Sequence, residues 1–194
     1  ADNNLTLDMV TSTDYLNRVH DNLQCFVSSD FEGIYDVEHL QSATWTDISE
    51  KIGFATTTGH NTPSNTISLN PYASDDNDAI VYIAFRYYDK DNVAERNRWV
   101  IRSINVEKSS PEGTETQVGN MKTMGWHAVT VSGDPVWTIT TSQLLAAGKT
   151  TTNNKDQWVI SKGFKIREAE PSTGVALKNI STTQREYEYT FTEP

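Results

Sequence analysis

Acidic residues cluster on both sides of the most apolar stretch of the sequence, residues 79–88. The two clusters consist of Asp75, Asp76, Asp78, Asp89 and Asp91. Carboxylate oxygens in loops at strand ends suit a hard cation such as calcium, which takes roughly six to eight oxygen ligands. Asp and Asn also favour turns without any metal, because their side chains bond the local backbone. The clusters therefore predict either a structural calcium ion or two solvated acidic turns.

Aromatic residues near loops and turns are candidates for binding a sugar. The C–H face of a pyranose ring can stack on an aromatic side chain, and neighbouring polar groups then bind its hydroxyls. The candidates are Trp126, His127, Trp137, Tyr72 and Tyr88. Trp126 lies in a loop-like stretch, so its ring is predicted either to face a ligand or to belong to the core. The other tryptophans, Trp45, Trp99 and Trp158, have apolar neighbours and are predicted to be core residues.

Residues for covalent or acid–base catalysis do not form a recognisable motif. The sequence has no Gly-x-Ser-x-Gly turn, and its four histidines lack the spacing of a zinc site. Its single cysteine, Cys25, excludes an intramolecular disulfide and lies in an apolar run, which predicts a buried, inert thiol. With 26 acidic residues, some carboxylate pair will have glycosidase spacing by chance. We therefore do not expect an enzyme, and a glycoside hydrolase is the enzymatic alternative.

The charge of the chain restricts its partners. Sixteen basic residues stand against 26 acidic ones, which gives a formal net charge of −10. Such a field repels phosphate backbones and anionic membrane surfaces, so nucleic acid is not an expected partner. No stretch approaches the roughly 20 apolar residues that a membrane-spanning helix needs, so no transmembrane segment is expected.

The elements that must position these residues are mainly short strands. Apolar and polar residues alternate with period two along much of the chain, and residues 79–88 are apolar on both faces, as in a central strand covered on both sides. Short helices are predicted only at Val37–Ala43, with Asp36 as its N-cap, and at Gln143–Ala147. About ten short strands separated by turn residues favour an all-β fold, a two-sheet β-sandwich (jelly roll) with one or two short helices in connections.

Several stretches together resemble a known group of domains. They are residues 26–31 (Phe-Val-Ser-Ser-Asp-Phe), 44–48 (Thr-Trp-Thr-Asp-Ile), 67–70 (Ile-Ser-Leu-Asn), 81–87 (Val-Tyr-Ile-Ala-Phe-Arg-Tyr), 99–101 (Trp-Val-Ile) and 156–161 (Asp-Gln-Trp-Val-Ile-Ser). This pattern resembles the jelly-roll domains of the choice-of-anchor and cleaved-adhesin type, which are MAM-like. The order of its two halves is permuted, as in an uncharacterised domain of surface lipoproteins from Gram-negative gut anaerobes.

The resemblance implies a domain organisation. It covers residues 22–194, the expected sandwich, whereas residues 1–21 fit poorly and are expected to be a linker or the remnant of a preceding domain. The chain is then expected to be part of a larger surface protein.

The resemblance also implies a function and a place. A non-catalytic carbohydrate-binding module is expected, with a polysaccharide or oligosaccharide as ligand and other outer-membrane glycan-uptake proteins as further partners. An adhesive or scaffolding domain that docks another surface protein is the alternative. The expected location is the cell surface or periplasm, through a lipid anchor outside this chain. Calcium is common in jelly-roll binding modules of this kind.

Overall fold

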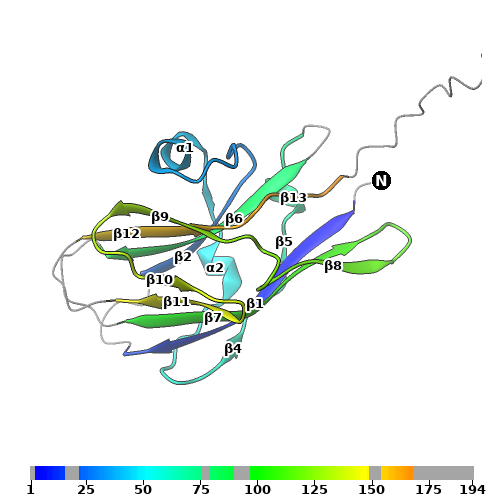
Figure 1. The fold of residues 1–194 in the computed structure, drawn as a ribbon. Coiled ribbons are helices and arrows are strands. Elements are labelled where there is room, and N and C mark those ends of the chain that lie inside the picture. The colour runs from blue at the N-terminus through cyan, green and yellow to red at the C-terminus, as the bar shows by residue number, and fades with distance from the viewer. Residues whose placement is uncertain (1–2, 16–21, 76–78, 90–96, 149–153, 168–194) are drawn as a thin grey trace, which may run out of the picture.

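Two stacked β-sheets make up the protein in a computed structural model (Figure 1). The structure describes residues 3–15, 22–75, 79–89, 97–148 and 154–167. Within these ranges the paired strands run antiparallel and the helices are short, so the predicted all-β sandwich is confirmed.

The first sheet contains the two longest strands of the described chain. Its order is β10 (Trp137–Ile139), β11 (Gln143–Ala147), β7 (Arg98–Ser109), β1 (Asn4–Asp14) and β4 (Thr62–Pro63). Two more strands pair off this path: β5 (Ile67–Ser68) with β1, and β8 (Glu115–Asn120) with β7. The hairpin of β7 and β8 extends past one end of the sandwich (Figure 1).

The second sheet is centred on the apolar strand predicted from the sequence. Its order is β3 (Thr46–Asp47), β2 (Leu23–Ser28), β6 (Ile80–Asp89), β12 (Lys155–Ile160) and β9 (His127–Ser132), with β13 (Phe164–Lys165) paired to β6. Residues of β6 are buried on both faces, in agreement with its central position.

The N-terminal segment belongs to the sandwich, contrary to the predicted boundary between residues 1–21 and 22–194. Strand β1 pairs with β7 over almost its whole length and also with β4 and β5. Leu5, Leu7 and Met9 alternate with half-exposed residues and are buried between the sheets. Because one face of β1 supplies core side chains, residues 4–14 are not a linker.

Of the two predicted helices, one is confirmed and one is wrong. Helix α1 (Val37–Ser42) begins after Asp36, whose carboxylate accepts a hydrogen bond from the His39 backbone N–H. Residues 143–147 instead form β11, where Leu144 and Ala146 enter the core. Five residues are too few to hold a helix on their own propensity, and pairing with β7 decides their structure.

The remaining helical elements lie in connections. They are α2 (Ser49–Ile52) and the 3₁₀ turn η1 (Asn70–Tyr72). No helix in the described part of the chain has the length and apolar character to span a bilayer.

The main core fills the space between the sheets. It includes Phe85 and Tyr87 of β6, Trp99 of β7 and the thiol of Cys25. The buried positions of Trp99 and Cys25 agree with the sequence predictions. Burial and the nearby Asp47 carboxylate raise the pKa of Cys25 well above its ordinary value, which favours the protonated thiol.

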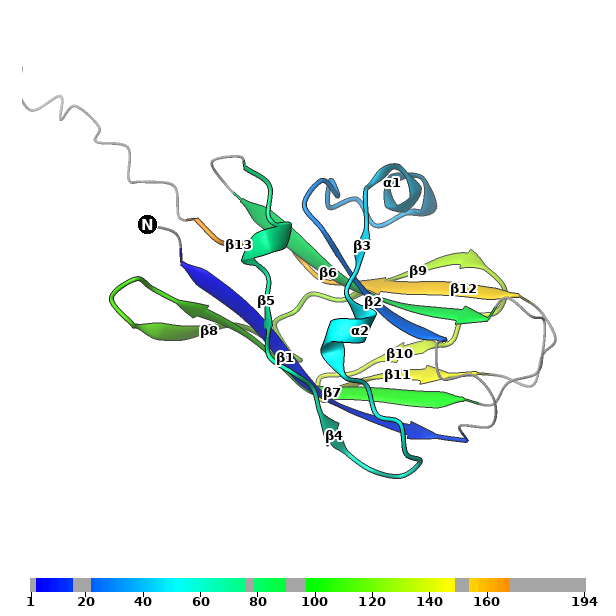
Figure 2. The ribbon, with the colours of Figure 1, turned by 180° about the vertical axis from the view of Figure 1, so that it is seen from behind.

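A second, smaller cluster covers the other face of the β6 sheet. Helix α1 and the loop before it lie against this outer face, away from the first sheet (Figure 2). The buried members are Phe26, Phe31, Leu40, Ala84, Val129, Trp158 and Ile160. Helix α1 stands over only part of the sheet (Figure 2), and the candidate site lies beside it.

Candidate functional site

A pocket of about 340 Å³ opens on the outer face of the second sheet, next to α1. Its lining residues come from four strands of the sheet, from α1 and from the segment that follows α1. They are Phe26, Leu40, Gln41, Ala43, Trp45, Arg86, Val131, Asp156 and Trp158. The pocket combines two indole rings with one basic and one acidic side chain.

Strand periodicity brings the polar residues together. Side chains two residues apart on a strand point to the same face, so Arg86 and Tyr88 share a face of β6, and Asp156 and Trp158 share a face of β12. In the antiparallel ladder Trp158 is opposite Arg86. On the other side of β6, Gln24 of β2 is opposite Arg86.

Arg86 and Asp156 form a two-point ion pair. The Arg86 Nε donates to Asp156 Oδ1 and its Nη2 donates to Oδ2, both at 2.7 Å. The indole Nε1 of Trp158 donates to the same Oδ1 at 2.9 Å. The Arg86 Nη1 lies 3.5 Å from Gln24 Oε1, which accepts from it. Both side chains are mostly but not fully buried, so the pair is held in one geometry while part of it still faces the pocket.

Aromatic rings surround this ion pair. The guanidinium carbon of Arg86 lies 3.9 Å from the ring centre of Tyr88 and 5.2 Å from that of Trp158, which are cation–π distances. Trp45 and Trp158 have ring centres 5.5 Å apart at an interplanar angle of 50°. Phe26 packs on Trp158 at 5.0 Å. These contacts give the pocket rigid apolar walls.

The loop that carries Trp45 is fixed by its own hydrogen bonds. The Trp45 Nε1 donates to the Leu40 carbonyl at 3.0 Å, which ties the ring to α1. The Asp30 carboxylate accepts from the Ser28 hydroxyl and from the Thr44 backbone N–H, both at 2.8 Å. Burial acts to raise the pKa of Asp30, but the hydrogen bonds from Ser28 and Thr44 prevail and lower it. Trp45 is therefore half-buried and preoriented.

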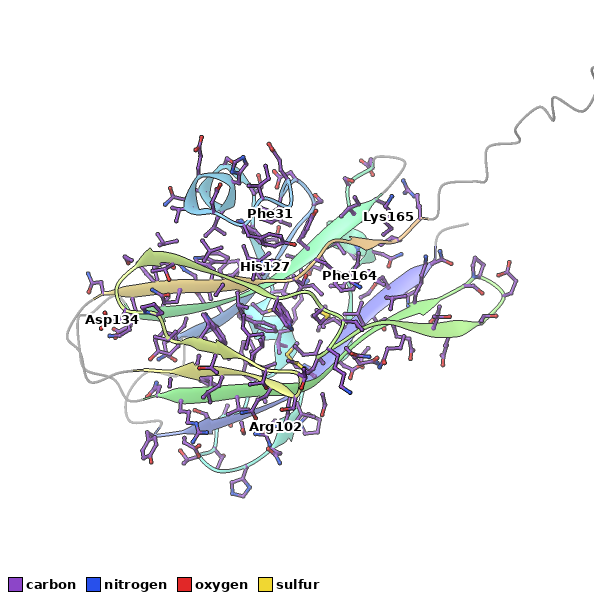
Figure 3. The ribbon with its side chains drawn as sticks, viewed as in Figure 1. Phe31, Arg102, His127, Asp134, Phe164 and Lys165 are labelled. Atoms are coloured by element: carbon purple, nitrogen blue, oxygen red, sulfur yellow. The ribbon has the colours of Figure 1, made fainter. Side chains whose placement is uncertain are left out.

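One of the five predicted sugar-binding residues lies beside this pocket. Tyr88 is two residues after Arg86 on the same face of β6, and its ring stacks on the guanidinium of Arg86. His127 lies on the same side of the sheet as Phe31 and α1 (Figure 3), where its ring stacks on Tyr35 at 3.9 Å. His127 is exposed, but it does not line the pocket.

The other three predicted residues lie elsewhere. Trp126 packs against Phe85 at 5.7 Å, on the inner face of the second sheet, rather than standing free at a loop end. Trp137 is half-buried and its Nε1 donates to the Gln157 carbonyl at 3.0 Å. Tyr72 of η1 bonds through its hydroxyl with the ammonium of Lys51. Trp126, Trp137 and Tyr72, which the sequence predicted to contact a ligand, thus contact other residues of the protein.

The acidic clusters do not converge in the described part of the chain. Asp75 is exposed, whereas Asp89 is buried with its Oδ2 4.0 Å from the ammonium of Lys155. Asp76, Asp78 and Asp91 lie outside the described residues. Among the residues that are described, no three His, Cys, Asp or Glu side chains are grouped to hold a metal. The ammonium beside Asp89 disfavours a second cation there.

One residue in the sequence, Arg86, could have indicated the pocket, although the predicted site was based on aromatic residues instead. Arg86 interrupts the outer face of a strand that is otherwise apolar there from Ile80 to Ala84. A charged side chain on a central strand requires a partner, because burying an unpaired charge is costly. The partner Asp156 is 70 positions away in the sequence, so spacing did not reveal it. Trp45 and Trp158 were predicted as core, and Trp158 is indeed buried, yet both also line the pocket.

Residues 1–126 match the model of a family described as Domain of unknown function (DUF5017). The chain belongs to this family. The match begins at residue 1, so it includes β1, which supports placing the N-terminal segment inside the domain. No curated protein and no solved structure matches the chain.

The pocket combines residues from inside and outside the matched range. Phe26, Trp45 and Arg86 lie within residues 1–126, whereas Asp156 and Trp158 follow them. The two strands that form the ion pair, β6 and β12, are adjacent in the sheet. Folding of the DUF5017 chain therefore completes the pocket with residues beyond the matched range.

Proposed function

We propose that this DUF5017 protein is a non-catalytic carbohydrate-binding module and that the pocket beside α1 holds the glycan. The observation that carries this proposal is the combination of Trp45 and Trp158 with the Arg86–Asp156 pair in one pocket. Aromatic rings offer a surface for the C–H face of a sugar, and the ion pair offers donors and acceptors for its hydroxyls.

The size of the pocket supports a small ligand. Its volume of about 340 Å³ is at the low end of the roughly 300–1,000 Å³ of small-molecule sites. This suits one sugar residue of a chain whose remainder extends along the surface. Because the walls are held by stacking and by the Trp45–Leu40 hydrogen bond, little ordering is needed on binding.

The geometry favours binding over hydrolysis. Both carboxylate oxygens of Asp156 accept hydrogen bonds from Arg86, and one also accepts from Trp158. Three of the roughly four acceptor positions of a carboxylate are then occupied by fixed donors, which leaves about one for a sugar hydroxyl and suits positioning rather than proton transfer. Within the pocket lining, Asp156 is the one carboxylate, whereas a glycosidase uses two across a cleft.

We further propose a setting for this module. The sequence resemblance to choice-of-anchor and cleaved-adhesin domains supports a surface lipoprotein that captures glycans at the outer membrane. A lipid anchor outside this chain would hold it there, beside other glycan-uptake proteins. The calcium ion expected at the acidic clusters stays a prediction, and chelation tests it.

A glycan-array screen with and without calcium, followed by titration calorimetry on the polysaccharides that bind, tests the proposal. Trp45→Ala is expected to weaken binding by at least about tenfold, which corresponds to ~1.4 kcal/mol. Trp137→Ala is a matched control, because Trp137 is also half-buried with its Nε1 bonded to one backbone carbonyl. Its affinity should stay within about twofold of the unmodified protein.

Two results would contradict the proposal. A folded protein that binds no glycan in either condition would favour a protein-docking or spacer role. Equal losses in Trp45→Ala and Trp137→Ala would show that binding does not use the pocket. Loss of binding on chelation alone would assign a role to calcium.

A further inference from the structure

We infer that the pocket selects neutral glycans and discriminates against those that carry carboxylates or sulfates. The inference rests on the proposed function and names the class of ligand for the same pocket. It derives from the way the charges of the pocket residues are paired.

Arg86 is the one cationic side chain among the pocket-lining residues, and its charge is already matched. Asp156 is the one anionic side chain among them, so the lining has no net charge. Three nitrogens of the guanidinium have partners: Nε and Nη2 bond Asp156, and Nη1 bonds Gln24. An anionic sugar would thus find no unmatched positive charge.

Gln24 and Asp47, next to the ion pair, add to the preference of the pocket against anionic sugars. The amide of Gln24 accepts from Arg86 through Oε1, and its Nε2 donates to Asp47 Oδ2 at 3.4 Å. The next charged group along this path is therefore another carboxylate, and it is exposed. The chain as a whole carries a formal charge of −10, which lowers the local concentration of polyanions further.

Sugar hydroxyls can bond to the N–H donors of Arg86 and the lone pairs of Asp156 that the ion pair leaves unused. A guanidinium has five N–H donors, of which the contacts above use three, and a carboxylate has further lone pairs. A sugar hydroxyl both donates and accepts, so it can bond to either partner without displacing the other. A carboxylate or sulfate only accepts, and it must approach Arg86 beside the negative charge of Asp156. The pocket therefore distinguishes ligands by charge as well as by shape.

The test compares neutral and anionic polysaccharides on the whole chain at low ionic strength, where charge effects are least screened. The neutral probes are galactan, xylan, mannan and β-glucan, and the anionic probes are polygalacturonate, alginate and chondroitin sulfate. Affinity gel electrophoresis and calorimetry give the dissociation constants. The unmodified protein should bind at least one neutral polymer about tenfold or more tighter than every anionic one.

Asp156→Asn is the decisive variant, because it keeps the side-chain shape and leaves Arg86 with an unmatched charge. It should gain affinity for polygalacturonate or another anionic probe, so that the neutral-to-anionic preference falls by about tenfold. Glu115→Gln is the control for net charge: it also removes one negative charge, but from the exposed start of β8 in the other sheet, and it leaves the Arg86–Asp156 pair intact. Its preference should change less than about twofold.

The outcomes separate this inference from the proposed function. Tighter binding of an anionic polymer by the unmodified protein overturns the inference and leaves glycan binding in place. An Asp156→Asn protein that is folded by circular dichroism and gains nothing for anionic probes also overturns it. Absence of binding to both classes overturns the proposed function itself. If Asp156→Asn does not fold, the comparison with the unmodified protein decides alone.

Discussion

Arg86 and Asp156 are diagonal rather than direct neighbours: in the ladder between β6 and β12, Arg86 is opposite Trp158 and Asp156 is opposite Tyr88. The guanidinium therefore crosses the face of the sheet to reach the carboxylate, and it passes within cation–π distance of both rings. Diagonal pairs are within reach of long side chains such as arginine. Arg86, Tyr88, Asp156 and Trp158 therefore form one block, in which the two aromatic rings flank the ion pair.

This block should show energetic coupling. Arg86→Met leaves a mostly buried carboxylate unpaired, and it should lower the free energy of unfolding by about 2 kcal/mol, less than a fully buried pair because solvent screens part of the interaction. Asp156→Asn should have a cost of the same order. A double-mutant cycle by urea unfolding should give a coupling of about 1–2 kcal/mol. Additive effects would mean that the pair does not form in solution.

Trp126 should contribute to stability rather than to binding. Trp126→Ala removes a ring that packs on Phe85 and should destabilise the protein by about 3 kcal/mol. The indole Nε1 is buried and has no hydrogen-bond partner among the described residues. Trp126→Phe should therefore be much less destabilising, since it removes an unsatisfied donor. Thermal unfolding and glycan titration together check this: a loss of binding at unchanged stability would restore Trp126 as a ligand residue.

His39 should titrate above the ordinary range of histidine. Its Nδ1 lies 2.7 Å from Asp36 Oδ1, and this hydrogen bond raises the pKa of His39. A raised pKa stabilises the folded state below the ordinary value of about 6.5. That contribution is lost as the pH rises through the folded-state pKa.

Asp36→Asn isolates this effect, because asparagine retains the helix cap but not the charge. The pKa of His39, followed by NMR of its ring protons, should fall in this variant while α1 persists. An unchanged pKa would mean that the Asp36 carboxylate is not the cause.

Cys25 should resist thiol reagents until the protein unfolds. It is fully buried, and burial together with Asp47 raises the pKa of Cys25. Because the unfolded chain ionises at the ordinary thiol value of about 8.5, stability from this group is complete below that pH and declines above it. Alkylation by iodoacetamide should follow the unfolding rate, with the protein in denaturant as the control. Rapid modification of the native protein would contradict the buried placement.

Local patterns in the sequence determined the fold class and several details. Period-two alternation identified a β-sandwich, the two-sided apolar run located β6, and Asp36 marked the start of α1. The apolar neighbours of Cys25 indicated its burial. These features depend on residues close to each other in sequence, so physical chemistry at short range is enough to predict them.

Tertiary pairing decided the rest. Residues 143–147 form a strand because β7 offers them a partner, and β1 belongs to the sandwich because its alternating side chains fill the core. The candidate site depends on strands that are far apart in the chain: the pairing of β6 with β12 brings Arg86 beside Asp156. Leu40 of α1 accepts the hydrogen bond from Trp45, and both residues line one side of the pocket. A charged residue reveals that it needs a partner, but only the order of strands in the sheet determines which residue that partner is.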